Sequence, residues 1–160
     1  MLSLDPVEIF ASKIVALLTR AAARDLYDVN NMVALGLFDN SQMELLRKCV
    51  VFYLAVGTDD TPVSFDYAKL DALTYRDIRM RLIPMLRKKD SFDLGSARER
   101  VKDYLSVLLT FTDEERDFLS SFRNGKYCPE LLLPGDEFAH LAKHPMAEWK
   151  MIVWERQQKQ

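Results

Sequence analysis

The sequence predicts an all-α protein, an irregular bundle of about seven to nine helices. Apolar residues recur at spacings of three and four along most of the 160-residue chain, which is the period of a helix that buries one face. Five glycines and six prolines punctuate this pattern, and several stand where a helix would begin or end. Because neither an internal repeat nor a low-complexity tract is present, residues 1–160 are expected to share one core as a single helical domain.

The first helix is predicted to begin after Asp5, since aspartate suits the N-cap position and Pro6 suits the first helical turn. Glu8, three residues after Asp5, is expected to complete a capping box. An apolar stripe that would face the core is formed by Val7, Phe10, Ile14 and Leu17.

The second helix is expected to start at Arg24 or Asp25 and to end at Gly36, because glycine suits the left-handed conformation that often follows a helix. Its inward face is formed by Leu26, Val29 and Val33.

A third helix is predicted over residues 42–56, starting from Asn40 or Ser41 and stopping at Gly57. Its apolar residues run almost all round the helix, which is usual for a helix at the centre of a bundle. Residues 57–65, GTDDTPVSF, are predicted to form a loop.

Residues 66–73 are predicted to form a short helix, and a longer one is expected to begin at Thr74. Pro84 must kink or split this longer helix, because proline lacks the amide hydrogen and clashes with the preceding turn. The face of the helix that would turn inward is formed by Tyr75, Ile78, Leu82 and Met85.

Two further helices follow. Ser96 is expected to cap one that runs to about Leu109, and Thr112 with Glu115 gives a capping box for another that ends near residues 124–125. The tail is predicted to form two or three short helices, broken at residues 134–135 (Pro-Gly) and at Pro145. Packing anchors near the C-terminus are expected at Phe138, Trp149 and Trp154.

Charge and cysteine usage limit the setting in which the protein works. The net charge of -2 gives no general attraction to nucleic acid or to an anionic membrane, so a polyanion would have to be bound by a local patch. Cys49 and Cys128 lie far apart and no secretory signal precedes them, which favours reduced thiols in a cytoplasmic protein. The longest apolar run, residues 49–56, is far shorter than the roughly 20 residues that span a bilayer, so no membrane partner is expected.

The first predicted helix carries a basic face. Lys13, Ala16 and Arg20 are spaced three and four residues apart, so they line one side, with the two cations about 10 Å apart along the axis. An elongated polyanion such as a nucleoside triphosphate would fit across this face, with the lysine acting as a point charge and the arginine binding phosphate oxygens as a fork. Arg24 adds a third cation just beyond it.

Asp25 and Asp28 share one face of the second helix. Carboxylates beside a phosphate site commonly help to hold Mg²⁺, orient a cation or accept a proton. A structural alternative stands beside this interpretation, because lysine and arginine stems often cover a core and an Arg–Asp pair often ties two helices together. The spacing leaves both interpretations open.

The segment LDPVEIFASKIVALLTRAAARDLYDVNNM, residues 4–32, resembles the signature of the AbiEii/AbiGii-type nucleotidyltransferase toxins. In that family a helix carries a lysine, an arginine seven residues later and then an R-D-x-x-D motif. These positions correspond to Lys13, Arg20, Arg24, Asp25 and Asp28. Three later segments also look similar to the helical C-terminal part of such proteins: DIRMRLIPML, TDEERDFLSSFRNGKYCPELL and HPMAEWK.

The resemblance implies a toxin of a bacterial type IV toxin–antitoxin or abortive-infection system, with a cognate antitoxin as partner. Such an enzyme transfers a nucleotide from an NTP with the help of Mg²⁺. The resemblance places Lys13 and Arg20 on the NTP phosphates, gives Asp25 or Asp28 a catalytic role and leaves Arg24 to orient the aspartates.

The sequence departs from the family in one respect. The family's N-terminal half supplies a sheet with a glycine-serine motif and a D-x-D pair that binds Mg²⁺, and neither motif is found here; residues 57–60, GTDD, are interpreted as a loop. The chain is therefore expected to represent the C-terminal helical part of such a toxin and to be inactive without the missing N-terminal segment. We expect Mg²⁺ and NTP to be bound only in the complete enzyme, and no metal site within these residues. An apolar patch left by the absent sheet would favour a homodimer.

A second hypothesis is a free-standing helical interaction module that binds an antitoxin or partner subunit without nucleotide chemistry. The charged residues of the first two helices would then be internal salt bridges.

Residues 74–89, TYRDIRMRLIPMLRKK, contain six cations and one acid, Asp77. This basic strip would suit the backbone of a tRNA or another RNA acceptor. A solvated helix face is the alternative.

Overall fold

The structure is a computed structural model that describes residues 5–59, 65–133, 135–136 and 138–160. Over these ranges it contains eight α-helices and no strand, which confirms the predicted all-α class. The α-helices are α1 (Pro6–Arg20), α2 (Ala23–Ala34), α3 (Asn40–Gly57), α4 (Ala68–Asp71), α5 (Tyr75–Asp77), α6 (Leu94–Leu108), α7 (Asp113–Arg123) and α8 (Pro145–Gln158). Shorter elements are the π-helical turn η1 (Ile78–Leu82) and the 3₁₀ turns η2 (Ile83–Met85), η3 (Pro129–Leu131) and η4 (Ala139–Lys143). Most of the loop predicted at 57–65, and the break predicted at Pro134, lie outside the described residues.

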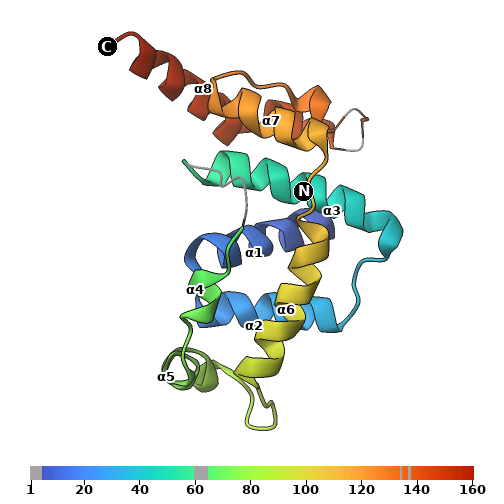
Figure 1. Cartoon of the computed structure of the whole chain (residues 1–160), viewed down its shortest axis with the longest axis vertical. Coiled ribbons are helices and arrows are strands. Elements are labelled where there is room, and N and C mark those ends of the chain that lie inside the picture. The colour runs from blue at the N-terminus through green and yellow to red at the C-terminus, as the bar shows by residue number, and fades with distance from the viewer. Residues whose placement is uncertain (1–4, 60–64, 134, 137) are drawn as a thin grey trace.

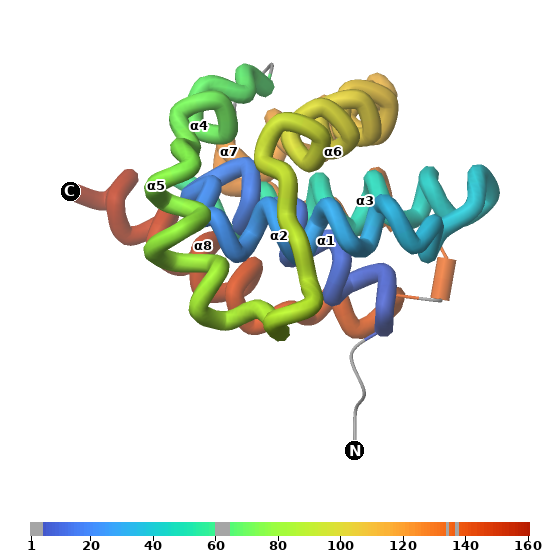
Figure 2. The backbone as a smooth tube through the Cα atoms, turned by 90° about the horizontal axis from the view of Figure 1, so that it is seen from below, coloured from blue at the N-terminus to red at the C-terminus, as the bar shows by residue number. Residues whose placement is uncertain are grey.

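The helices are stacked in layers in the order α2, α1, α3 and then α7 with α8 (Figure 1). α6 crosses the layers and packs mainly against α2. In the view from below, η1 and the neighbouring turns lie along the outer side of α2 (Figure 2). α1 and α2 therefore form one end of the stack, and the tail of the chain covers the other.

α3 lies at the centre of the core, as its nearly continuous apolar surface predicts. Cys49, Val50 and Val51 are fully buried although they are consecutive, so neighbours cover several sides of this helix. The most extensive packing of α3 is with α1, which contributes the buried Phe10 and Ile14. One continuous cluster of buried side chains extends from α1 and α2 to Leu141 and Ala147 in the tail.

The turn between α1 and α2 consists of two residues, Ala21 and Ala22. Ala21 has a positive φ of 48°, the only such angle at a non-glycine residue in the part of the chain that the structure describes. A left-handed alanine costs about 1 kcal/mol, so neighbouring contacts must hold it in place. α2 begins at Ala23, slightly before the predicted start at Arg24 or Asp25.

Two predicted helix starts are wrong in detail. Asp5 caps α1 as expected, accepting a hydrogen bond from the Val7 amide at 2.8 Å, but Glu8 does not complete a capping box. Its side chain is 3 % exposed and its carboxylate bonds other elements of the core instead. α6 is capped by Asp93, which accepts from the Ser96 amide at 2.7 Å, and not by Ser96 itself.

The segment after Thr74 changes helix type before Pro84, which confirms that proline interrupts it. Ile78 and Leu82 are buried as predicted. Tyr75 and Met85 are exposed, so the expected inward face is only half correct. The wider π turn and the tighter 3₁₀ turn that follows change the angle between successive side chains, so the α-helical spacing no longer predicts which of them face inward.

The capping box of α7 is confirmed. Thr112 accepts from the Glu115 amide at 3.3 Å, and the Glu115 carboxylate accepts from the Thr112 amide at 2.8 Å. The same buried carboxylate also binds Arg47 of α3, with both Nε–O distances at or below 2.9 Å. Glu115 thus serves as a cap and as a tie between α3 and α7.

The tail contains η3, η4 and α8, which agrees with the predicted two or three helices, and Pro145 is the first residue of α8. Phe138 is buried and Trp154 is half-buried beside Gly125, so both pack as expected. Trp149 is 56 % exposed, so its predicted role as a packing anchor is wrong.

Candidate functional site

Two ion pairs join α1 to α2 at the predicted site. Lys13 Nζ lies 2.7 Å from Asp28 Oδ2. Arg20 binds Asp25 as a fork, with Nε to Oδ2 and Nη2 to Oδ1 both at 2.7 Å. The charge of Lys13 also acts on the Asp25 carboxylate, so the pairs are electrostatic neighbours. The sharp turn at Ala21 produces this arrangement by folding the start of α2 back beside α1.

Asp25 is enclosed by its partners. Its side chain is only 2 % exposed, and Oδ2 accepts a third hydrogen bond from the Ala22 amide at 3.1 Å. Burial alone would raise the pKa of this carboxyl. The hydrogen bonds from Arg20 and Ala22, together with the charges of Arg20 and Lys13, outweigh burial and hold the pKa below its ordinary value. Asp25 is therefore ionised at neutral pH, and its carboxylate is already used to hold the corner together.

The cations are much more accessible than the acid beneath them. The Arg20 side chain is 68 % exposed despite its two bonds to Asp25, and that of Lys13 is 39 % exposed. A guanidinium has five N–H groups, so the fork on Asp25 leaves others directed to solvent. Arg24 is also exposed, and no ion pair involves it over the ranges that the structure describes. The structure thus brings Lys13, Arg20, Asp25 and Asp28 together, with Arg24 at their edge.

This arrangement suits an anion and not a metal ion. Oriented N–H groups of arginine and a lysine ammonium bind phosphate oxygens well. Asp25 and Asp28 already bind cations of the chain. Within the described ranges, no group of three or more His, Cys, Asp or Glu side chains is placed to hold a metal ion. In this arrangement neither Asp25 nor Asp28 offers a carboxylate that is free of a cationic partner.

Comparison with known families bears on these residues directly. A profile described as nucleotidyl transferase AbiEii toxin, type IV TA system, matches residues 1–117, and both ion pairs fall within the match. The chain belongs to the AbiEii family. Neither the curated proteins nor the solved structures searched contain a match to it.

AbiEii membership confirms the resemblance seen in the sequence. It makes the chain a relative of nucleotidyltransferase toxins of toxin–antitoxin systems, and it implies in general an antitoxin partner and the use of Mg²⁺ and NTP. The match ends at residue 117, so most of TDEERDFLSSFRNGKYCPELL and all of HPMAEWK lie beyond it. None of the helices that the structure describes is long and apolar enough to cross a bilayer.

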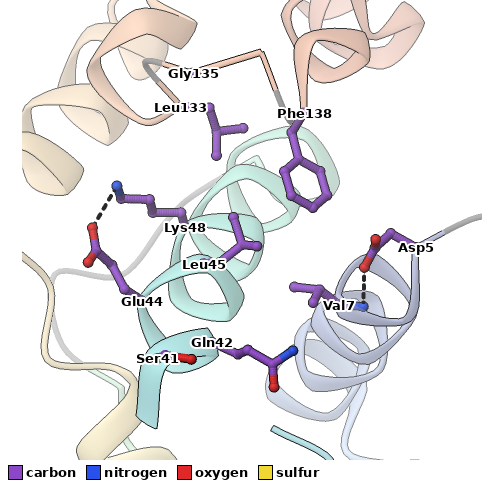
Figure 3. Close-up of a pocket in the computed structure, with 10 residues that line it drawn as sticks. All are labelled: Asp5, Val7, Ser41, Gln42, Glu44, Leu45, Lys48, Leu133, Gly135 and Phe138. Carbon is purple, nitrogen blue, oxygen red and sulfur yellow. Dashed lines mark hydrogen bonds and ion pairs between the residues drawn. The ribbon is translucent and has the colours of Figure 1, made fainter. Parts of the chain in front are cut away.

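The cavity of the AbiEii chain drawn in Figure 3 does not coincide with the predicted site. It measures about 480 Å³ and lies between the first turns of α1 and α3 and the segment around Leu133 and Phe138. Among its described lining residues are two acids, Asp5 and Glu44, and one cation, Lys48, whose Nζ lies 2.8 Å from Glu44 Oε1. Two carboxylates and a neutralised lysine would not attract a triphosphate. None of the predicted site residues lines it.

A polar cluster around the buried Glu8 was not predicted. Tyr53 donates a hydrogen bond to Glu8 Oε1 at 2.8 Å, and His140 Nε2 lies 3.0 Å from Glu8 Oε2. Burial and the hydrogen bond to Glu8 raise the pKa of Tyr53 above its ordinary value. The cluster joins α1, α3 and η4, and no local signal reveals it because its members are 45 and 132 residues away from Glu8.

The predicted basic strip is exposed. Arg76 lies in α5, Arg79 and Arg81 lie in η1, and residues 87–89 follow η2; all six cations are exposed. None of them forms an ion pair within the ranges that are described, although Asp77 is close enough to feel the charges of Arg76 and Arg81. The strip therefore remains a concentrated positive surface on a chain whose net charge is negative.

Proposed function

We propose that the α1–α2 corner is the triphosphate-binding side of an AbiEii nucleotidyltransferase site. Lys13 and Arg20 would bind phosphate oxygens, and Arg24 would add positive charge at the edge. The observation that supports this most is the contrast within one ion pair. Arg20 is fixed by a nearly inaccessible carboxylate while its own side chain is 68 % exposed. An arginine held in this way is pre-organised for an anion, because little side-chain entropy remains to be lost on binding.

The two aspartates would have different roles. Asp25 would act through Arg20 as a positioning residue, because its oxygens already accept three hydrogen bonds. Asp28 is 26 % exposed and pairs with Lys13. When Lys13 binds a phosphate, Asp28 would be released to accept a proton or to orient another cation. Of the two predicted catalytic residues, Asp28 is thus the candidate for direct contact with the reacting groups.

We infer that nucleotide transfer also needs a segment that carries the family's D-x-D pair. In this family Mg²⁺ is held by a D-x-D pair and neutralises charge on the phosphates, and that motif is not found in this sequence. Such a segment would have to meet the α1–α2 corner from the solvent side, where Lys13 and Arg20 are open. The chain described here would then bind NTP weakly and transfer nothing without that segment.

Calorimetric titration with each Mg-NTP tests this proposal. We expect millimolar binding that weakens by about tenfold in Lys13→Ala and in Arg20→Ala, as for loss of one charge-assisted hydrogen bond. Arg116→Ala is a matched control, since Arg116 is an exposed arginine of α7 that pairs with Asp113 of the same helix, away from the α1–α2 corner. Binding that is equal in all four proteins would contradict the proposal. So would an absence of binding after the D-x-D segment is supplied in trans.

The interaction-module hypothesis is supported by a different observation, the burial of Asp25 against the left-handed Ala21 turn. If the pairs serve only to hold the corner, Arg20→Ala would lower the melting temperature while no NTP shifted it in the unmodified protein. The calorimetric experiment and a thermal shift assay with NTP therefore separate the two functions.

We further propose that the basic strip is where an RNA acceptor would bind. Phosphate contacts release counterions, so binding should weaken steeply with salt. A filter-binding assay with tRNA should give a smaller salt dependence for Arg79→Gln and Arg81→Gln than for the unmodified chain. Lys102→Gln, which removes a cation that is already paired with Asp71, should leave the dependence of tRNA binding on salt unchanged. An equal dependence of tRNA binding on salt in all of these proteins would indicate that the strip is a solvated helix face and does not contact RNA.

A further inference from the structure

α8 buries little surface against its own chain. Ala147 is the only buried residue among its 14, whereas Met146, Trp149 and Ile152 are 46, 56 and 48 % exposed. The C-terminal turns extend past the ends of α3 and α7 (Figure 1). Helices of about 12–15 residues are marginal in water unless an apolar face is packed. The exposed stripe formed by Met146, Trp149 and Ile152 therefore lacks the cover that normally stabilises such a helix.

A groove of about 270 Å³ lies beside this stripe. Trp149 belongs to both the stripe and the groove, which runs between α8, α7 and the end of α3. Its apolar walls are formed by Ala55, Leu119, Phe122, Val153 and Trp154. The groove is also lined by Asp59, Arg123 and Lys150. It therefore offers a recess with both apolar and charged side chains next to the protruding apolar stripe.

The charges around the stripe complement one another across a twofold axis. Glu148 and Arg156 are exposed, lie on either side of Ile152 and form no ion pair with other residues that the structure describes. In an antiparallel pair of identical helices centred on Ile152, Glu148 of each copy faces Arg156 of the other. Trp149 then lies level with residue 155 of the second copy, next to the part of the groove lined by Val153 and Gln157. The contact is closed and self-complementary, as a twofold interface requires.

We propose that α8 is a dimerisation helix, which packs antiparallel against α8 of a second copy of this chain. Trp149 of each copy enters the groove of the other, Ile152 lies at the axis, and two Glu148–Arg156 ion pairs fix the register. The same charges disfavour a parallel arrangement, because Glu148 would then meet Glu148 and Arg156 would meet Arg156. This surface is independent of the α1–α2 corner and of the family match, which ends before α8.

Sedimentation velocity over a range of chain concentrations tests the interface. We expect a reversible dimer whose dissociation constant rises about tenfold or more in Trp149→Glu, as for loss of a central tryptophan. Val107→Glu is the matched control, because Val107 is 68 % exposed on α6 and should not affect association. A chain that stays monomeric at the highest concentration would overturn the proposal, and so would a dimer that is indifferent to Trp149→Glu. Circular dichroism confirms that each variant is folded.

Charge reversal and crosslinking test the register. Glu148→Arg should weaken the dimer, and adding Arg156→Glu to the same chain should restore it, since each pair is re-formed with opposite signs. Oxidation of Ile152→Cys should give a disulfide-linked dimer, whereas Val107→Cys, which has the same native cysteines, should not. Failure of the double variant to restore association, or equal crosslinking of the two cysteine variants, would contradict the antiparallel arrangement.

Discussion

The buried carboxylate of Asp25 accepts three hydrogen bonds. The balance between burial and these bonds sets its pKa. Because the folded-state pKa lies below the ordinary value, ionised Asp25 stabilises the folded chain. This contribution is complete above the unfolded-state pKa of about 3.9 and is lost as the pH falls through the lower folded-state value. The same residue that orients Arg20 is thus a source of acid sensitivity.

Asp25→Asn should reduce the free energy of unfolding at pH 7 by about 1–3 kcal/mol, because an amide cannot accept the fork from Arg20 and leaves buried polar atoms poorly paired. The difference from the unmodified chain should shrink as the pH falls below about 3.9. Urea unfolding at several pH values measures it. A difference in the free energy of unfolding that stayed constant below about pH 3.9 would show that the lowered pKa of Asp25 does not contribute to stability.

Gly125 and Gly36 give a matched pair of substitutions, since both have positive φ values, 77° and 59°. A Cβ at Gly125 would lie 2.3 Å from two ring atoms of Trp154, whereas a Cβ at Gly36 would meet nothing within 4 Å. We expect Gly36→Ala to lower the free energy of unfolding by about 1 kcal/mol and Gly125→Ala by about 2–5 kcal/mol. Chemical denaturation measures both, and equal losses would mean that Trp154 moves aside at no cost.

At the scale of elements, α8 depends on its first turn. His144 Nδ1 accepts a hydrogen bond from the Met146 amide at 3.2 Å, and the imidazole packs edge to face against Phe52 with centroids 5.3 Å apart. Burial lowers the pKa of His144 below its ordinary value, although the charge of Glu8 opposes this effect. The folded chain therefore favours the neutral ring, which is the form that caps the helix. Its stabilising contribution is lost as the pH falls from about 6.5 through the lower folded-state pKa.

His144→Ala should increase fraying of α8 and cost about 1 kcal/mol, as for loss of other N-caps, with a further loss from the ring contacts. His144→Asn should keep a cap that does not titrate in this range. Amide hydrogen exchange measures this fraying. The protection factors of α8 should fall between pH 7 and pH 5 in the unmodified chain and stay constant in His144→Asn. A fall in the protection factors of His144→Asn as large as that of the unmodified chain would assign the pH response to another group.

The sequence predicts most helices because apolar period, caps and prolines are local signals. Thr112 with Glu115, and Gly36 and Gly125, mark ends that the structure confirms. Prediction from the sequence fails where the outcome depends on distant contacts. Glu8 occupies a capping-box position, but its carboxylate bonds Tyr53 and His140 instead of the backbone. The grouping of Lys13, Arg20, Asp25 and Asp28 follows from spacing, whereas their pairing depends on the left-handed turn at Ala21, which alanine does not signal.

At the scale of the whole molecule, the buried cluster extends from α1 to α8 without interruption over the described residues. The family match stops at residue 117, yet Phe118, Leu132 and Leu141 beyond it are essentially inaccessible to solvent. The tail is therefore expected to be part of the same folding unit as the matched region, as the single-domain prediction has it.

Both tryptophans lie in α8, so intrinsic fluorescence reports on the tail, while far-ultraviolet circular dichroism reports on all the helices. We expect the two signals to give one coincident urea transition, because a shared core unfolds cooperatively. The measurement should be made at a low chain concentration, so that association does not contribute. A fluorescence transition at lower urea would indicate a tail that unfolds separately.

The contacts described above differ greatly in how far along the chain they reach. Arg20 and Asp25 are five residues apart and Lys13 and Asp28 are 15 apart, but Glu8 and His140 are separated by 132 residues. Closing a short loop loses little chain entropy, so we expect the α1–α2 hairpin to form early in folding. The contact between Glu8 and His140 is expected to form late. Glu8→Gln should then accelerate unfolding in stopped-flow experiments and leave the refolding rate nearly unchanged. A slower refolding limb would place this contact in the transition state.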